Sequence, residues 1–484
     1  MSPASIERSS SAKKVAIAGG GLAGLAAGCA LADAGFRVTL FERRPYLGGR
    51  ASSYQHPGTG EVVDNCQHVL LGCCTNLIDF YRRTGVEEKI RWYERLTFLE
   101  PGGRQSVIEP SDLPAPFHTA PAFLHAPCLT FSDKLAIGRA MMTLAASTPA
   151  DGSESFLEWL QRHGQTAPAI ERFWRTILVS ALNEDLDRVS VPYAAQVARE
   201  SFLKSAAAGR MGIPTVPLTD LYSAAGEYIH ARGGVVQLRT GVVSFRGQND
   251  GVSVVTNGET QNFDYLVLAV PFDVLGRMLA DMSADDESGT SLETVLAKFS
   301  TSPITGIHLW FDREISELDH AVLLDRTIQW MFHKSRILEL RNQATRNPVS
   351  PEKESGSYVE LVVSCSRSLV EKSKNEIVEL AVKELKDFFP EARAATLVKS
   401  TVIKEVHATY SPRPGIDSYR PKAETVWPRV FLAGDYTATG WPATMEGAVR
   451  SGHLAAEALA RSEGRDENFL VPDLPAAGLM RLFG

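Results

Sequence analysis

The strongest chemical signal in the sequence is a run of glycines near the N-terminus. Gly19, Gly21 and Gly24 have the G-x-G-x-x-G spacing that brings a backbone turn close to a pyrophosphate at the start of a helix. Gly19 permits the tight turn, Gly21 the close approach, and Gly24 the close packing of the helix on a strand. Leu22 and Ala23 fall in the first helical turn, where N–H groups favour phosphate charge. The spacing predicts a dinucleotide phosphate site.

The flanking residues supply the elements that such a site needs. A short apolar strand over 15–18 precedes the glycines, an Ala- and Leu-rich helix runs to residue 34, and a second strand ends in Glu42. A carboxylate at that place can accept hydrogen bonds from ribose hydroxyls and disfavours a 2′-phosphate. This segment therefore predicts a βαβ unit that binds a dinucleotide other than NADP.

The next residues separate FAD from NAD. Residues 42–51 read E-R-R-P-Y-L-G-G-R-A, and they include Arg43, Gly49, Arg50 and Ala51. This run resembles the extended motif of the FAD-dependent amine oxidase and phytoene desaturase superfamily, in which the paired glycines and the arginine continue the phosphate and ribityl site. The resemblance implies FAD as the cofactor.

Two later segments resemble the parts of this superfamily in which the chain returns to the cofactor. In the first, the backbone near residue 243 would contact adenine, and residues 269–271 would pass close to the cofactor. In the second, an apolar strand over 430–433 ends in a Gly-Asp pair, and a helix starts near residue 443. A helix N-terminus aimed at the cofactor favours its negative charge. These segments add Val243, Ala269, Gly434, Asp435 and Met445 to the predicted cofactor-binding residues.

Two longer blocks narrow the resemblance. Residues 64–72 read D-N-C-Q-H-V-L-L-G, and residues 432–452 read L-A-G-D-Y-T-A-T-G-W-P-A-T-M-E-G-A-V-R-S-G. They resemble the hydroxysqualene dehydroxylases of squalene and hopanoid synthesis, over roughly residues 13–461. Cys66 stands where that family has glycine, and Tyr436 stands where it has tryptophan.

This narrower resemblance implies a reaction. Hydroxysqualene, a hydrophobic C30 isoprenoid, would lose its hydroxyl, and reduced FAD would deliver hydride to the allylic carbon to give squalene. The electron donor that reduces FAD is unknown from sequence. Hydroxide leaves poorly, so a proton donor is expected.

Three residues are the catalytic candidates: His68, Gln67 and Glu446. A histidine can hold a transferable proton near neutral pH, so His68 is either the acid or a hydrogen-bonded neighbour of the flavin. We expect Glu446 to cap or orient the last helix, and Asp435 to serve the cofactor.

Three alternatives share the fold. A carotenoid-type desaturase would remove hydrogens from an apolar polyene precursor, a flavin amine oxidase would oxidise an amine, and a carrier without FAD would bind prenylated partners. Some amine oxidases link FAD to a cysteine near the C-terminal motif, but the last cysteine here is Cys365, well before Gly434. Non-covalent FAD is therefore predicted, and the intact motifs disfavour the carrier.

Composition excludes other classes. The chain has 484 residues, of which 44% are hydrophobic and 22% charged, and its net charge is −7 without a Lys/Arg-rich block. Disorder and a nucleic-acid partner are therefore disfavoured. The six cysteines form no C-x-x-C pair, and the eleven histidines lack H-x-H and H-E-x-x-H spacing, so no metal site is predicted.

The lengths of the apolar stretches indicate where the protein is located. Residues 1–14 lack the apolar core of a signal peptide, and no stretch is long enough to cross a bilayer. We expect a cytoplasmic protein. Its apolar C-terminal tail either docks on the protein's own surface or provides peripheral membrane contact.

The predicted fold class is α/β: a discontinuous Rossmann-like FAD-binding domain with a parallel sheet and a β-meander, an α+β substrate domain, and a helical subdomain. The FAD-binding domain comprises 13–85, 213–282 and 426–461, and the substrate domain comprises 86–212 and 283–425. Residues 1–12 and 462–484 are predicted to be flexible or docking tails.

Residues 86–211 are expected to be mostly helical, with Ser132 capping a helix over 134–146. Further helices are expected over 221–232, 372–388 and 443–461, and strands over 235–239, 242–246, 252–256, 265–270, 304–311 and 358–365.

Overall fold

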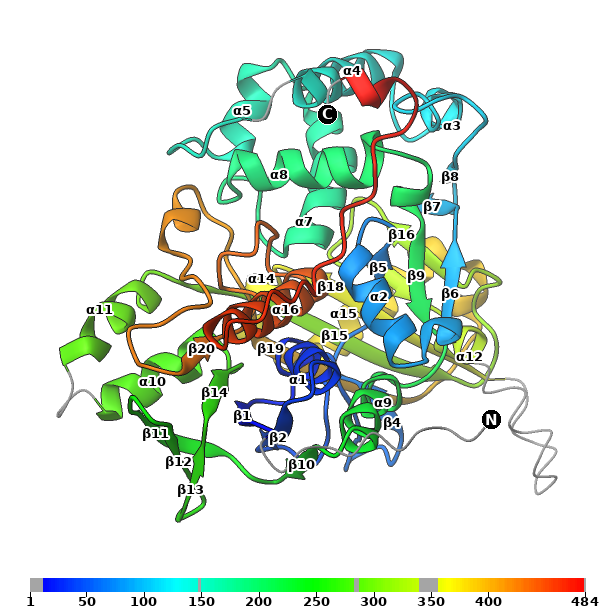
Figure 1. Cartoon of the computed structure of the whole chain (residues 1–484). Helices are drawn as coiled ribbons and strands as arrows, with labels where there is room; N and C mark the ends of the chain where they lie inside the picture. Colours follow the sequence, from blue (N-terminus) through cyan, green and yellow to red (C-terminus); the bar gives the residue numbers. More distant parts are fainter. Residues whose placement is uncertain (1–11, 147–148, 283–286, 339–355, 483–484) are drawn as a thin grey trace, which may run out of the picture.

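The computed structural model describes residues 12–146, 149–282, 287–338 and 356–482. Three parts are visible in Figure 1: a sheet carrying α1, α9 and α16 at the bottom, a larger sheet behind it, and a group of helices at the top. This arrangement confirms the predicted α/β class with a parallel sheet, a meander and a helical part.

A parallel sheet forms the nucleotide-binding part. Its strand order is β10-β2-β1-β14-β20, and every pairing is parallel. The strands are β1 (Lys14–Ala18), β2 (Arg37–Glu42), β10 (Val235–Leu238), β14 (Tyr265–Leu268) and β20 (Val430–Leu432). Segments far apart in the chain therefore build one sheet. The glycine turn lies at the carboxyl edge of β1, which is the edge where such sheets bind ligands.

Helix α1 (Leu22–Asp33) is buried along almost its whole length. It lies between the sheet and α16 (Met445–Ser462), with α9 (Leu218–Ala231) beside it (Figure 1). Gly452 permits the close contact of α1 with α16, since a Cβ there would lie 2.2 Å from the Ala23 carbonyl oxygen. Such enclosure accounts for a helix that is apolar on every side up to its last residue, Asp33.

A three-stranded antiparallel meander follows, made of β11 (Val242–Gly247), β12 (Val252–Thr256) and β13 (Glu259–Phe263). The strands predicted over 242–246 and 252–256 are confirmed. Strand β13 was not predicted, because its residues are mostly polar and it lies at the edge of the meander. The predicted strand over 235–239 does not join the meander but pairs with β2.

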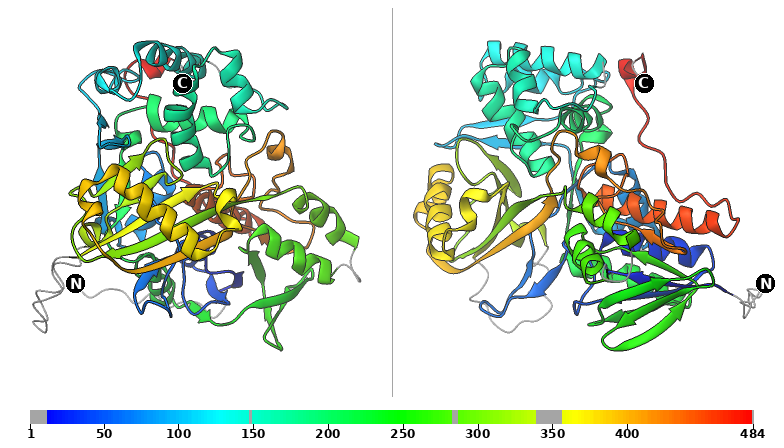
Figure 2. Two further views of the ribbon diagram at one scale, coloured as in Figure 1. Left: turned by 180° about the vertical axis from the view of Figure 1, so that it is seen from behind. Right: turned by 90° about the vertical axis from the view of Figure 1, so that its left-hand side faces the viewer.

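A seven-stranded sheet forms the floor of the second part, in the order β19-β15-β18-β17-β16-β7-β8. The turned views of Figure 2 show α15 (Lys374–Phe388) covering the outer face of this sheet. The strands are β7 (Leu96–Leu99), β8 (Gln105–Ile108), β15 (Thr301–Phe311), β16 (His320–Leu323), β17 (Trp330–Phe332), β18 (Ser357–Ser364) and β19 (Leu397–Tyr410). The predicted strands over 304–311 and 358–365 are thus confirmed as β15 and β18.

The expectation of a mostly helical stretch over 86–211 is wrong at both of its ends. Strand β6 (Ile90–Tyr93), β7 and β8 lie in its first part, and β9 (Met211–Pro214) starts at its end. Each of these strands has only four residues. In so short a segment, the alternation of apolar residues typical of a strand cannot be distinguished from the spacing typical of a helix.

Between these strands the chain is helical. The helices include α4 (Phe131–Ala146), α5 (Phe156–Arg162), α7 (Thr176–Leu182) and α8 (Val191–Val197). Ser132 does not cap α4: the backbone N–H of Asp133 donates to Thr130 Oγ1, and the N–H of Thr130 donates to the Asp133 carboxylate. This reciprocal pair moves the start of the helix to Phe131.

The C-terminal tail docks on the protein. Phe469 and Met480 are buried, and the Leu479 N–H donates to the Ala115 carbonyl oxygen. Leu479 and Leu482 remain exposed. Among the described residues, no helix combines the length and the apolar character that a membrane span requires.

Candidate functional site

A cavity of about 500 Å³ joins the glycine turn to the interior of the second part. One end is formed by backbone and polar groups around β1, β2 and β20. The other end is apolar, and its lining residues include Phe98, Ile177, Val197, Phe202, Ile304, Val322, Trp330 and Phe332. Most predicted cofactor-binding residues line the first end: Gly19, Gly21, Leu22, Ala23, Glu42, Arg43, Gly49, Arg50, Ala51, Ala269, Gly434, Asp435 and Met445.

The glycines of the first turn have the separate roles that their spacing predicts. Gly19 has φ +112°, and a Cβ there would lie 2.5 Å from the Ala269 carbonyl oxygen. A Cβ on Gly24 would lie 2.0 Å from the Gly19 carbonyl oxygen, so Gly24 serves packing and does not line the cavity. A Cβ on Gly21 would meet only Gly49 Cα, at 3.8 Å. The space in front of Gly21 is therefore open.

The N-terminus of α1 faces this open space, and among the described residues no side chain caps its first turn. Gly21 is the N-cap residue and offers no side-chain cap, and the first turn holds no acidic residue. The leading N–H groups of a helix need acceptors and attract anions. This cradle fits a pyrophosphate.

Glu42 fixes the turn from the end of β2. Its two carboxylate oxygens accept hydrogen bonds from the N–H groups of Gly20 and Arg44, each at 2.7 Å. The side chain is buried but lies on the cavity wall. Because each oxygen retains a further lone pair, the carboxylate can also accept a ribose hydroxyl, as its position predicts.

An ion pair joins the two sequence motifs that lie farthest apart. Arg50 Nη2 lies 2.8 Å from Asp435 Oδ1, and Arg50 Nη1 donates to the Ala408 carbonyl oxygen at 2.7 Å. Asp435 follows β20 and Arg50 follows β2, so the pair links, at the cavity wall, chain segments that leave two strands of one sheet.

The prediction at Val243 concerns a backbone contact, and the structure places this segment beside the cavity. The Val243 side chain is 59% exposed, whereas Val242 lines the cavity. The pairing of β11 with β12 shifts register between Val242 and Ser244. The contact of adenine with the backbone near Val243 stays a prediction.

His68 lies on the cavity wall, with its Nδ1 2.7 Å from the Cys66 carbonyl oxygen. A carbonyl only accepts, so Nδ1 carries the proton and Nε2 presents a lone pair. Burial lowers the pKa of His68. The geometry therefore favours a neutral ring that accepts a proton or hydrogen bond at Nε2. The acid role considered from the sequence is less favoured.

Gln67 is held from both sides of its amide. Its Nε2 donates to the His68 carbonyl oxygen at 3.0 Å, and its Oε1 accepts from Lys334 Nζ at 2.7 Å. Lys334 belongs to α12 (Lys334–Ile337) and also binds Asp64. Sequence reasoning missed Lys334, because a lone lysine far along the chain carries no motif.

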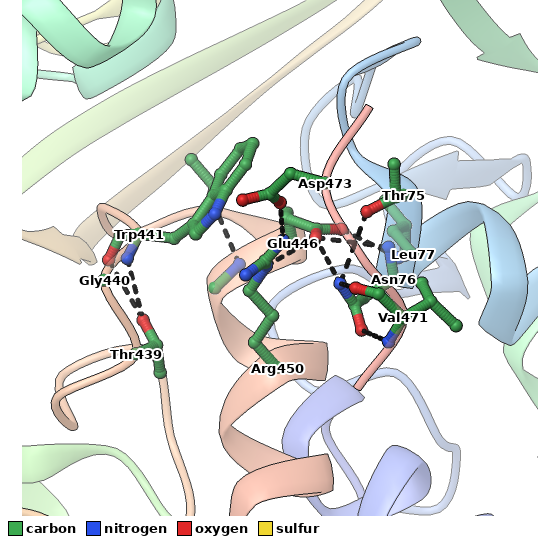
Figure 3. Close-up of polar contacts among 12 residues, drawn as sticks. Thr75, Asn76, Leu77, Thr439, Gly440, Trp441, Glu446, Arg450, Val471 and Asp473 are labelled. Carbon is green, nitrogen blue, oxygen red and sulfur yellow. Dashed lines mark hydrogen bonds and ion pairs between the residues drawn. The ribbon is translucent and has the colours of Figure 1, made fainter. Parts of the chain in front are cut away.

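Glu446 is completely buried and lies on the cavity wall, and its hydrogen bonds are made within the protein (Figure 3). It accepts hydrogen bonds from the backbone N–H groups of Asn76 and Leu77, at the start of α2 (Thr75–Arg83), and from Arg450 Nε at 2.7 Å. Thr444, not Glu446, caps α16. Burial raises the pKa of the Glu446 carboxyl, and Arg450 and the N–H donors oppose that shift. Glu446 therefore binds the N-terminus of α2, whereas the sequence led us to expect it to cap or orient α16.

The same group of residues fastens the C-terminal tail. Arg450 pairs with Asp473 and stacks over the Trp441 ring, with its Cζ 4.8 Å from the ring centre. Asn76 exchanges two hydrogen bonds with the Val471 backbone. Trp441 lines the cavity, so this network connects the tail to the cavity wall (Figure 3).

Glu184, Asp185 and Cys365 bring three ligand-type atoms within 4.8 Å of one another. Arg367 donates to both Glu184 carboxylate oxygens and to Cys365 Sγ. The guanidinium therefore already supplies the positive charge that this cluster needs.

Three cysteines (Cys66, Cys73 and Cys74) line the cavity, and all are free. Burial raises the pKa of the Cys66 thiol well above its ordinary value, which keeps it protonated and weakly nucleophilic. We expect acid precipitation to leave the flavin in the supernatant. Flavin that stays with the pellet would show a covalent link.

Comparison with known proteins places these observations in a family. Residues 22–460 match the family model described as "Flavin containing amine oxidoreductase". The chain is 28% identical to a 15-cis-phytoene desaturase from Synechococcus elongatus over 471 residues, which is 92% of this chain and 95% of that protein. It is 26% identical to a probable zeta-carotene desaturase from the same organism, covering 93% of this chain and 99% of that one.

Solved structures share the fold at lower identity. An oxidoreductase from Methanosarcina mazei superposes with a TM-score of 0.68 at 17% identity. The superposition covers 93% of this chain and 100% of that oxidoreductase. A cyclohexylamine oxidase from Brevibacterium oxydans superposes with a TM-score of 0.65 at 16% identity. The superposition covers 94% of this chain and 100% of that oxidase.

Proposed function

Because this chain belongs to the flavin containing amine oxidoreductase family, we propose that it exchanges hydride between bound FAD and a carbon atom of a long apolar isoprenoid. The chain is an FAD-dependent oxidoreductase. The observation that carries the proposal is the continuity of the cavity, in which the cofactor cradle and a long apolar wall belong to one space. Such a wall suits a hydrocarbon and excludes water.

FAD, when bound, supplies hydride acceptance and donation. The protein's residues supply the rest. The backbone around Gly21 and the Arg50–Asp435 pair would bind and orient the cofactor. The neutral ring of His68 offers Nε2 as a proton acceptor or hydrogen-bond acceptor on the cavity wall.

The first candidate reaction is desaturation of a polyene precursor. Two observations support it. The relatives named above, which the chain matches over nearly its whole length, are phytoene and zeta-carotene desaturases. A neutral His68 suits the loss of a proton from the substrate, because desaturation removes a proton together with a hydride.

The second candidate is reductive dehydroxylation of hydroxysqualene to squalene. It is supported by the two sequence blocks over 64–72 and 432–452, which lie on the cavity wall at several positions. This reaction needs a proton donor for the departing hydroxyl, and His68 in its observed hydrogen bonding is not prepared for that task.

One paired assay separates the candidates. Purified holoenzyme is incubated with phytoene under oxidising conditions and, separately, with hydroxysqualene and reduced flavin without oxygen. We expect turnover of one isoprenoid substrate, with additional conjugated double bonds or squalene as the respective product. Turnover of an amine such as putrescine, with neither isoprenoid consumed, would contradict the proposal.

We also propose that the helical part contacts a lipid bilayer, since an isoprenoid of this length resides there. Among the described residues, sixteen large hydrophobic side chains are exposed, and eight of them lie in 113–142 and 479–482. Phe131, Leu135 and Met142 follow one face of α4, with Arg139 on its exposed side. An apolar stripe flanked by a basic residue is typical of interfacial helices.

The expected result for Phe131→Ser/Leu135→Ser is loss of most sedimentation with phospholipid vesicles, while turnover of a detergent-solubilised substrate is retained. Both side chains are exposed, with Phe131 at 74%, so folding should not suffer. Val398→Ser, at an exposed site on the large sheet, is the control. Equal sedimentation of all three proteins would refute the contact.

A further inference from the structure

A buried ion cluster lies directly behind the cavity wall. Lys334 Nζ is 2.7 Å from Asp64 Oδ2 and 3.5 Å from Glu360 Oε2. The three side chains are between 0% and 4% exposed. The ammonium also donates to Gln67 Oε1 at 2.7 Å, and Gln67 lines the cavity.

The charges in this cluster are fixed by their mutual contacts. Burial would lower the pKa of Lys334, but Asp64 and Glu360 raise it above its ordinary value. Burial would raise the pKa of Asp64, but Lys334 and hydrogen bonds lower it. Glu360 has a pKa raised to about 8, chiefly by burial. Lys334 and Asp64 therefore form the ion pair at neutral pH, and burial disfavours the charged form of Glu360.

Stability alone does not account for such a cluster. Well-packed apolar side chains of similar volume often stabilise a core as well as a buried ion pair does, because desolvation offsets the attraction between the charges. The cluster does have a geometric effect that apolar residues could not reproduce. It joins the end of β4 (Val62–Asp64), next to the cofactor cradle, to α12 and β18 of the large sheet.

The effect is transmitted through Gln67. With its oxygen held by Lys334 and its nitrogen donating to the His68 carbonyl oxygen, the Gln67 amide has one orientation. The His68 ring is in turn held by the Cys66 carbonyl oxygen. The turn over residues 66–68 thus depends on an ammonium that arrives from a distant part of the chain.

We propose that Lys334 is a positioning residue, whose ammonium, anchored by Asp64, fixes Gln67 and the His68 ring at the point where cofactor and substrate meet. The proposal rests on FAD binding at the cavity and not on which isoprenoid reacts. It involves no contact between Lys334 and the substrate.

The test compares Lys334→Met, Lys334→Met/Asp64→Asn and Gln67→Leu. The double variant removes both charges, so it avoids the unpaired buried carboxylate that would destabilise the single variant. Gln67→Leu leaves the ion cluster whole and removes only the amide. Lys399→Met is the matched control, because Lys399 of β19 pairs with the partly exposed Glu61.

Three properties are measured: FAD content, the visible spectrum with the midpoint potential of bound flavin, and kcat and KM separately. We expect all three test variants to bind FAD, to share one altered spectrum and potential, and to lose roughly 100-fold in kcat with little change in KM, as for small misplacements of reacting groups. Lys399→Met should match wild type.

A wild-type spectrum and potential in both Gln67→Leu and the double variant would overturn the proposal. The flavin readouts need no substrate, so an unaltered flavin refutes the role of Lys334 even if the assigned reaction is correct. Conversely, an altered flavin supports that role even if neither isoprenoid is turned over.

Discussion

Gly21→Val is expected to abolish FAD binding and leave the fold intact. The added Cβ would enter the open space in front of α1, where the nearest atom, Gly49 Cα, lies 3.8 Å away. That space is where the pyrophosphate would approach the helix N-terminus. Gly21 has an extended backbone with φ −78°, which valine adopts without strain. We expect FAD affinity to fall at least 100-fold, which corresponds to about 2.7 kcal/mol.

The measurement is a titration of apoprotein with FAD, together with thermal unfolding of the apoprotein. Two nearby glycines provide controls. Gly24→Val would place its Cβ 2.0 Å from the Gly19 carbonyl oxygen and should unfold the domain. An added Cβ at Gly35 would meet nothing within 4 Å, but the residue has φ +82°, so Gly35→Ala should lower stability somewhat and retain FAD. If Gly21→Val bound FAD with wild-type affinity, the cofactor could not lie along the glycine turn.

Glu446→Ala should destabilise the protein by about 3–5 kcal/mol, the range for breaking a buried ion pair. The change leaves the Arg450 guanidinium without its 2.7 Å partner and removes the acceptor from two N–H groups at the start of α2. Loss of that anchor should also loosen the tail at Asp473, which shares Arg450 (Figure 3).

Denaturant unfolding of the holoenzyme measures this effect, and limited proteolysis followed by mass analysis detects the loosened tail. Glu424→Ala is the control, since its pair with Arg461 is exposed and should contribute little. Glu446→Gln distinguishes structure from catalysis. It should lower stability while kcat of the folded fraction stays within a few-fold of wild type. A large loss of kcat at unchanged stability would instead assign Glu446 to the chemistry.

Much of the cofactor site could be predicted from sequence because its chemistry is local. The turn, the helix N-terminus and Glu42 are defined by residues within one βαβ unit, and their spacing fixes their geometry. Long elements with clear periods were predicted nearly to their ends, such as α9, α15 and α16. Four-residue strands such as β6 and β7 were not, because so few residues show no distinct period.

What the sequence by itself determined is the expected cradle, namely the residues predicted to receive a dinucleotide, with FAD as the cofactor. Only the tertiary structure decided which distant groups complete it. Arg50 and Asp435 are separated by 385 positions and meet through the strand order of one sheet. Lys334 reaches Asp64 because the large sheet packs against the cradle. Such contacts depend on how elements assemble, and spacing along the chain carries no information about them.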